Sequence, residues 1–162
     1  MLLAPAEVVG MNKVERILCP TDLSTDPDEA LKHAVTLAQA YDAKLLLLHC
    51  SEQYPLGDDE NSLKVNTQLM RLFKVSLAPY LSDAAKELKW EGLVRNGVYH
   101  VGKAIVTEAS KQNVDLIVLR ARRRTRVSSL PDATAQTVCR NAPCPVIVAH
   151  SSEAQLYMEP CN

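Results

Sequence analysis

The segment KLLLLHC, residues 44–50, decides the fold class of this chain. It is apolar almost throughout and too short to form a helix of its own. It therefore predicts a strand that is buried on both faces, as strands of parallel sheets are. Four more short segments are predicted to be strands: Arg16–Pro20, Glu91–Gly97, Leu116–Leu119 and Pro145–Ala149.

Segments with helical spacing lie between these strands. The four predicted helices carry their apolar residues over 31–41, 69–88, Lys103–Asn113 and Ala133–Asn141. Strands that alternate with helices in this way form a parallel sheet with right-handed crossovers.

The ends and breaks of the helices are predicted from residues that favour turns. Asp26 is the expected N-cap of the first helix, and Pro27 fits its first turn. A polar loop over 51–62 precedes the second helix, and Pro79 is expected to kink or split that helix.

The length of 162 residues favours one domain. Hydrophobic residues make up 47% of the chain and charged residues 23%, which is an ordinary globular balance. We expect a flexible N-terminal extension over 1–12, one domain over 13–150 and a polar C-terminal tail over 151–162.

The net charge of −1 argues against two classes of partner. Bulk affinity for nucleic acid or for an anionic membrane needs many unpaired basic residues, so neither is expected. No apolar stretch approaches the roughly 20 residues that span a bilayer.

The cysteines indicate a reducing, cytoplasmic location. They are five in number, so one would be left over from any pairing, and no two form a C-x-x-C motif. Free cysteines in apolar stretches act as small hydrophobic residues. The four histidines are scattered, so no metal site is expected. The cysteines are Cys19, Cys50, Cys139, Cys144 and Cys161.

Three segments together with LLLLHC carry a resemblance to a known family. They are ILCPTDLS (17–24), DLIVL (115–119) and CRNAPCPVIV (139–148). Over about residues 13–150 the chain resembles universal stress proteins. The resemblance implies a stress-response protein with a Rossmann-like five-stranded parallel sheet in the order 3-2-1-4-5. It also implies a homodimer formed through the last strand.

In such a sheet the ligand cleft lies where the strand order reverses, here between the first and fourth strands. Family members that bind ATP carry G-x2-G-x9-G-[ST] after the fourth strand, because glycine lets the backbone approach phosphate. This chain has Arg120, Arg123, Ala133 and Thr134 at those positions, so the motif is degenerate. No cofactor is therefore expected, with ATP or AMP as the alternative.

Two more positions match the family. Asp22 corresponds to the aspartate beside the nucleoside in nucleotide-binding relatives, and Cys50 to a residue that lines the adenine pocket. Asp22 has a second interpretation, as a cap for the turn into the first helix, and Thr134 likewise as the N-cap of the fourth helix.

The basic loop Arg120–Arg126 allows three interpretations. It is a solvated loop, a docking patch for an acidic protein partner, or an anion site built from side chains. His49 is either a core-edge histidine or a catalytic residue. Cys139 and Cys144 are either structural or redox-active.

The segment GVYHVGKA (97–104) resembles a phosphate-binding P-loop in its G-x4-G-K spacing. The next position holds Ala104, so the hydroxyl that binds Mg²⁺ in a P-loop is absent. We interpret the segment as the turn into the third helix.

These features favour a non-catalytic stress-response protein that acts as a homodimer and through partners. The expected dimer interface is the last strand, which carries no charged residue to prevent pairing. The alternative is a sensor module that binds ATP or AMP in a modified pocket. Weak ATPase activity ranks third, because no catalytic base or metal ligand is apparent. The interface residues are Pro145, Val146, Ile147, Val148 and Ala149.

Overall fold

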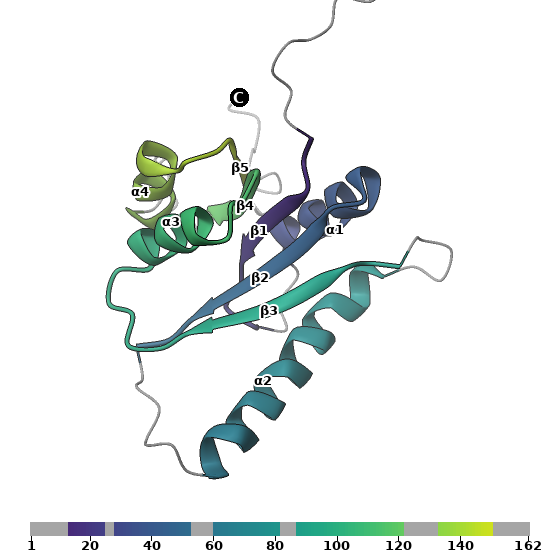
Figure 1. Cartoon of the computed structure of the whole chain (residues 1–162), viewed down its shortest axis with the longest axis vertical. Coiled ribbons are helices and arrows are strands. Elements are labelled where there is room, and N and C mark those ends of the chain that lie inside the picture. Colours follow the sequence, from purple (N-terminus) through teal and green to yellow (C-terminus); the bar gives the residue numbers. More distant parts are fainter. Residues whose placement is uncertain (1–12, 25–27, 53–59, 82–86, 122–132, 151–162) are drawn as a thin grey trace, which may run out of the picture.

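Five parallel strands form one sheet in the order β3-β2-β1-β4-β5 (Figure 1). The computed structural model describes residues 13–24, 28–52, 60–81, 87–121 and 133–150. The parallel sheet and its strand order are confirmed, and every strand end lies within two residues of its predicted position. The strands are β1 (Arg16–Pro20), β2 (Lys44–Cys50), β3 (Trp90–Arg95), β4 (Leu116–Ala121) and β5 (Val146–His150).

The apolar segment that predicted the fold is β2, and it is buried on both faces. Leu45 and Leu47 belong to one cluster of core residues, and Leu46 and Leu48 belong to the other. All four side chains are at most 2% exposed. Successive side chains of a strand point to opposite faces, so the unbroken apolar run reflects a sheet that is covered on both sides.

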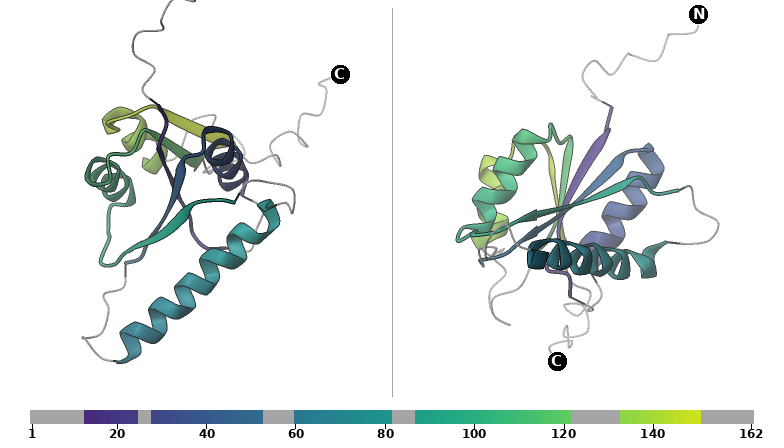
Figure 2. Two further views of the ribbon diagram at one scale, coloured as in Figure 1. Left: turned by 45° about the vertical axis from the view of Figure 1, so that its right-hand side comes forward. Right: turned by 60° about the horizontal axis from the view of Figure 1, so that its bottom comes forward.

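Two helices cover each face of the sheet (Figure 2). On one face Ala34 of the first helix and Phe73 of the second join the core. On the other face Ile105 of the third helix and Val138 of the fourth do so. The helices are α1 (Glu29–Tyr41), α2 (Glu60–Leu77), α3 (Val101–Lys111) and α4 (Ala133–Asn141).

The N-cap of α1 is Asp28, so the prediction of Asp26 was wrong. Asp28 has an extended backbone and its Oδ1 accepts a hydrogen bond from the Leu31 N–H at 3.1 Å. This satisfies one of the N–H groups that have no partner within the helix. Asp26 and Pro27 lie outside the described residues.

The second helix ends earlier than predicted. α2 stops at Leu77 and a 3₁₀ turn, η1 (Ala78–Tyr80), follows, so the helix ends next to Pro79 and no described residue after η1 continues it before β3. Leu88 does not belong to a helix but packs, partly buried, against the core. Tyr80 fixes the turn, because its hydroxyl accepts a hydrogen bond from the Asp28 N–H at 2.9 Å.

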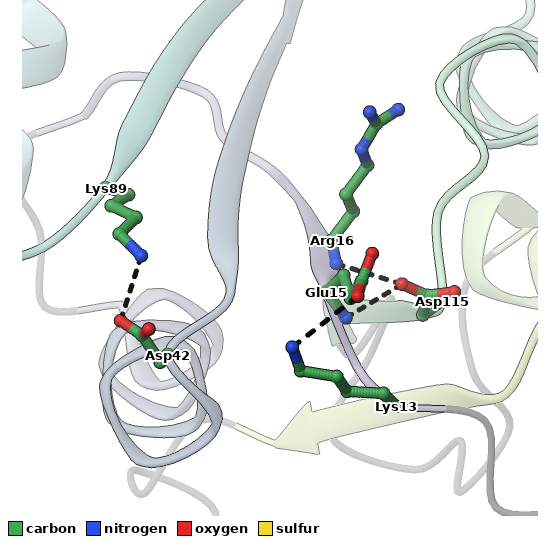
Figure 3. A network of polar contacts seen from close by, with 6 residues as sticks. All are labelled: Lys13, Glu15, Arg16, Asp42, Lys89 and Asp115. Carbon is green, nitrogen blue, oxygen red and sulfur yellow. Dashed lines mark hydrogen bonds and ion pairs between the residues drawn. The ribbon is translucent and has the colours of Figure 1, made fainter.

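Asp115 fastens the start of β1 to the start of β4 (Figure 3). Its Oδ2 accepts hydrogen bonds from the N–H groups of Glu15 at 2.9 Å and Arg16 at 3.0 Å.

Nearby, Lys89 forms an ion pair with Asp42 at 3.1 Å, but both side chains are largely exposed. Exposed pairs of this kind contribute at most about 1 kcal/mol.

Cys19 is a structural thiol. It lies in β1 and is fully buried, and burial raises the pKa of its thiol well above the ordinary value. We expect Cys19→Ser to lower the free energy of unfolding by about 1–3 kcal/mol, because it places a more polar hydroxyl in the core. Urea denaturation measures the change, with Cys139→Ser as the control, since Cys139 is exposed. Equal stability of the two variants would contradict the assignment.

Candidate functional site

A cavity of about 320 Å³ opens at the carboxyl ends of β1, β2 and β4. It lies between β1 and β4, where the strand order reverses, which is where open α/β sheets bind ligands. The starts of α1, α3 and α4 close its sides. The residues that line it are Pro20, Thr21, Asp22, Asp28, Leu48, His49, Cys50, Val101, Ile105, Leu119, Arg120 and Thr134.

The cavity brings together four of the six candidate ligand residues. Asp22, Cys50, Arg120 and Thr134 all line it, although they come from four different segments of the chain. Ala133 is exposed and is not part of the lining. Arg123, with the remainder of the basic loop to Arg126, lies outside the described residues.

A tight turn after β1 holds Asp22 at the cavity. Asp22 Oδ1 accepts a hydrogen bond from the Ser24 N–H at 2.9 Å, and Thr21 Oγ1 accepts one from the Leu23 N–H at 3.1 Å. Leu23 adopts a φ of 57°, in the left-handed region. The aspartate therefore stabilises the turn that leads toward α1, while the helix itself is capped by Asp28.

His49 is fixed by the same turn. Its Nδ1 lies 3.1 Å from the carbonyl oxygen of Thr21. Because a carbonyl only accepts, Nδ1 carries the proton and donates it. This geometry favours the core-edge interpretation of His49 over the catalytic one.

A buried ion pair lies beside Cys50 on the neighbouring strand. Arg95, the register partner of Cys50, donates from Nε to Glu108 Oε2 at 2.8 Å and from Nη2 to Oε1 at 2.6 Å. Gln112 donates a third hydrogen bond to Glu108 at 2.9 Å. The Glu108 side chain is 2% exposed, so these donors replace its hydration.

The pKa values of this group follow from burial and pairing. Burial acts to raise the pKa of Glu108, but hydrogen bonds from Gln112 and Arg95 and the charge of Arg95 outweigh it, so the pKa is lowered. Burial raises the pKa of the Cys50 thiol, although Arg95 opposes this. Cys50 is therefore a protonated thiol at neutral pH and a weak nucleophile, so it serves as part of the cavity wall.

The pairing of Arg95 with Glu108 was missed by the sequence analysis. The available signal was a charged residue, Glu108, on the apolar face of the third predicted helix, beside Ile105 and Ala109. A carboxylate in such a position requires a partner.

The starts of α3 and α4 correct one prediction and agree with another. Thr134 is the second residue of α4, so its interpretation as the N-cap was wrong. Gly97 has a φ of 68° in the turn before α3, as expected for a turn into that helix. Gly102 lies inside α3 and packs against α4: an added Cβ would lie 2.8 Å from the Cβ of Thr137. Its role is helix packing and not phosphate binding.

The described residues hold neither a cluster of metal ligands nor a helix suited to a membrane. No group of three or more His, Cys, Asp or Glu side chains among them is arranged to hold a metal ion. No helix in the described part of the chain has the length and apolar character needed to cross a membrane.

The sheet order and the position of the cavity define a doubly wound α/β domain with its ligand cavity at the reversal of strand order. The sequence model of the universal stress protein family matches residues 13–150. The chain belongs to the universal stress protein family.

Known proteins are similar to this chain in sequence and in fold. A curated universal stress protein of Methanocaldococcus jannaschii is 29% identical over 144 residues, which are 86% of this chain and 84% of that protein. The structure of UspA from Lactobacillus plantarum superposes with a TM-score of 0.60 at 22% identity, covering 85% of this chain and 98% of that one. The structure of a universal stress protein in complex with cAMP superposes with a TM-score of 0.59 at 19% identity, and the match covers 87% of this chain and 100% of that one.

Proposed function

We propose that this chain is a non-catalytic stress-response protein that acts as a homodimer, formed through β5, and through protein partners. The observation that carries the proposal is the position of β5 at the edge of the sheet. It pairs with β4 on one side, and no described strand pairs with its other side. A bare edge exposes unpaired backbone groups, and pairing with a second copy satisfies them.

The backbone of β5 supports this pairing. The Pro145 carbonyl accepts a hydrogen bond from the Ile117 N–H at 3.0 Å, so it points toward β4. Backbone groups of a strand alternate in direction, so those of Val146 and Val148 point toward the open edge. The side chain of Ile147 is 39% exposed, which leaves an apolar group for a partner to cover.

A dimer formed through β5 should be weakened by a charge placed at this edge. We expect the unaltered chain to be a dimer at micromolar concentration and Ile147→Lys to raise its dissociation constant about tenfold or more, because twofold symmetry brings like charges together. Light scattering measures the mass over a concentration series. Tyr41→Lys is the control, since Tyr41 is 46% exposed but lies on α1. A monomer at all micromolar concentrations would rule out the dimer.

The cavity favours a second candidate function, a nucleotide-responsive module that binds AMP or ATP in a modified pocket. It brings Asp22, Cys50, Arg120 and Thr134 together at the reversal of the strand order. One structural relative was solved in complex with cAMP. Mass spectrometry of protein purified without added ligand tests this function, and a co-purified adenine nucleotide is the result that supports it.

The remaining parts of the proposal concern catalysis, partners and location. The hydrogen bond of His49 to a backbone carbonyl and the protonated state of Cys50 support a non-catalytic role over a weak ATPase. The basic loop Arg120–Arg126 is the proposed docking patch for an acidic partner, in a cytoplasmic protein whose domain spans 13–150.

A further inference from the structure

The sheet has a second open edge, which is formed by β3. This strand pairs with β2 along its whole length, and no described strand pairs with its other side. Figure 1 shows β3 at the side of the sheet opposite to β5, with α2 running beside it. An open edge exposes backbone N–H and C=O groups, so another extended chain can pair with it.

The hydrogen bonds of β3 show which of its backbone groups point outward. The Lys89 and Arg95 carbonyl groups each accept a hydrogen bond at 2.8 Å from a backbone N–H in β2 or directly after it. The odd-numbered residues of β3 therefore direct their backbone groups toward β2. Because these groups alternate along a strand, those of Trp90, Gly92 and Val94 point toward the open edge.

The side chains beside this edge are apolar on one face of the sheet and charged on the other. On the face of α2, a Cβ added at Gly92 would lie 3.3 Å from the Met70 Sδ, and Met70 is 40% exposed. On the opposite face, Glu91 and Arg95 stand on either side of the buried Leu93. A chain that pairs with β3 therefore covers an apolar side chain on one face and meets two opposite charges on the other.

The guanidinium of Arg95 lies at the open edge and has donors to spare. Its Nη1 donates to the Val94 carbonyl at 2.9 Å, and this carbonyl is one of the groups that point outward. Two more of its five N–H donors bind Glu108. The described part of the chain offers no partner to the remaining donors, so they can bind a carboxylate that approaches the edge.

Glu91 of a second copy can supply this carboxylate. Its Oε2 forms an ion pair with Lys44, its side chain is 48% exposed, and a carboxylate has about four lone-pair sites. When two β3 strands pair antiparallel about a twofold axis at Leu93, Glu91 of each copy stands directly opposite Arg95 of the other. Opposite charges in this position stabilise an antiparallel pair, whereas like charges destabilise it.

The backbone favours the same register. Gly92 of each copy then stands opposite Val94 of the other, and both residues direct their N–H and C=O groups outward, so they form a hydrogen-bonded pair. The Val94 carbonyl can accept this bond as well as the one from Arg95, because it has two lone pairs. A twofold axis at Gly92 would instead set Arg95 against Lys89 of the other copy and leave Glu91 without an opposite charge.

We propose that the β3 edge is a self-association surface, on which a second copy of the chain binds antiparallel through its own β3. The two Glu91–Arg95 pairs determine the partner and the register. This interface is separate from the one proposed at β5 and does not require it. With both interfaces in place, copies join alternately through β5 and β3.

Sedimentation equilibrium tests the proposal in an Ile147→Lys background, where a dimer through β5 is disfavoured. We expect this chain to associate with a dissociation constant of about 100 μM. Adding Glu91→Lys should raise that constant about tenfold or more, because the new lysine faces Arg95 of the other copy. Glu15→Lys is the matched control, since Glu15 is an exposed glutamate that pairs with Lys13 and precedes β1. It should leave the constant unchanged.

Hydrogen exchange measured by NMR reports the register residue by residue. The N–H groups of Gly92 and Val94 should exchange more slowly as the concentration rises from about 10 μM to about 1 mM. The Leu93 N–H points toward β2 and should stay protected throughout, also in Glu91→Lys, which shows that this variant is folded. Exchange of Gly92 and Val94 that does not depend on concentration, or equal association of the Glu91→Lys and Glu15→Lys variants, would overturn the proposal.

Discussion

Arg95→Met will lower the free energy of unfolding by about 3 kcal/mol at neutral pH, the lower end of the range for breaking a buried ion pair. The change leaves the Glu108 carboxylate, 2% exposed, with one of its three side-chain hydrogen bonds, the one from Gln112. The lower end applies because the Arg95 side chain is 37% exposed, so solvent screens part of the interaction.

The loss in the free energy of unfolding caused by Arg95→Met will depend on pH. The pKa of Glu108 is lowered in the folded protein, so the ion pair contributes stability above the unfolded pKa of about 4.3 and loses it as pH falls through the folded value. Without Arg95, burial dominates and favours the protonated form. The difference from the unaltered chain is therefore largest at neutral pH and becomes smaller below about pH 4. Urea denaturation at both pH values measures it.

Two further variants separate this ion pair from general effects of substitution. Adding Glu108→Leu to Arg95→Met should recover much of the loss, because no unpaired charge stays buried. Lys44→Met removes the ion pair with Glu91, whose partners are 45% and 48% exposed, and should cost at most about 1 kcal/mol. A small, pH-independent effect of Arg95→Met would contradict the structural role of the pair.

Glycine at positions 120, 123 and 133, where the family resemblance predicts the glycines of ATP-binding members, will raise the affinity for ATP by about tenfold, although it removes two positive charges. Glycine lets the backbone N–H groups approach phosphate at little ordering cost. Ordering an arginine side chain costs about 1.5–2 kcal/mol when it is fully immobilised. Arg120 also lines the cavity near the end of β4, so its side chain occupies space there. The variant is Arg120→Gly with Arg123→Gly and Ala133→Gly.

Calorimetry with ATP and Mg²⁺ compares this triple variant with the unaltered chain. Arg140→Gly is a control for the loss of a cationic side chain, because Arg140 lies in α4 outside the cavity. A lower ATP affinity in the triple variant would show that the arginines themselves hold the triphosphate, and the nucleotide-sensor function would then be the better account.

The sheet could be predicted because strands that are buried on both faces consist of consecutive apolar residues. The four leucines of β2 are apolar on both faces, and both faces are covered. The same apolar pattern wrongly predicted that the second helix extends to Leu88, which continues the pattern but does not lie in a helix. Apolar spacing reports burial, whereas the α-helix itself ends at Leu77, shortly before Pro79, which has no N–H to donate.

Details that depend on three-dimensional distance could not be predicted. Asp26 and Asp28 are equally good capping residues, and the path of the chain selects Asp28. The ion pair of Arg95 and Glu108 joins a strand to a helix, so no local sequence motif predicts it. The positions of Asp22 and Arg120 at one cavity were foreseeable, because the ends of neighbouring parallel strands meet at one edge of the sheet.

The most direct test of the account is a calorimetric titration of the unaltered chain with ATP and Mg²⁺. The central claim of the account is that the cavity at the reversal of strand order is present, but that arginine and alanine in place of the glycines of ATP-binding members prevent tight binding of a triphosphate. We predict a dissociation constant weaker than about 100 μM, equivalent to about −5.5 kcal/mol. A dissociation constant of a few micromolar would contradict the claim and show that Arg120 and its neighbours replace the glycine cradle.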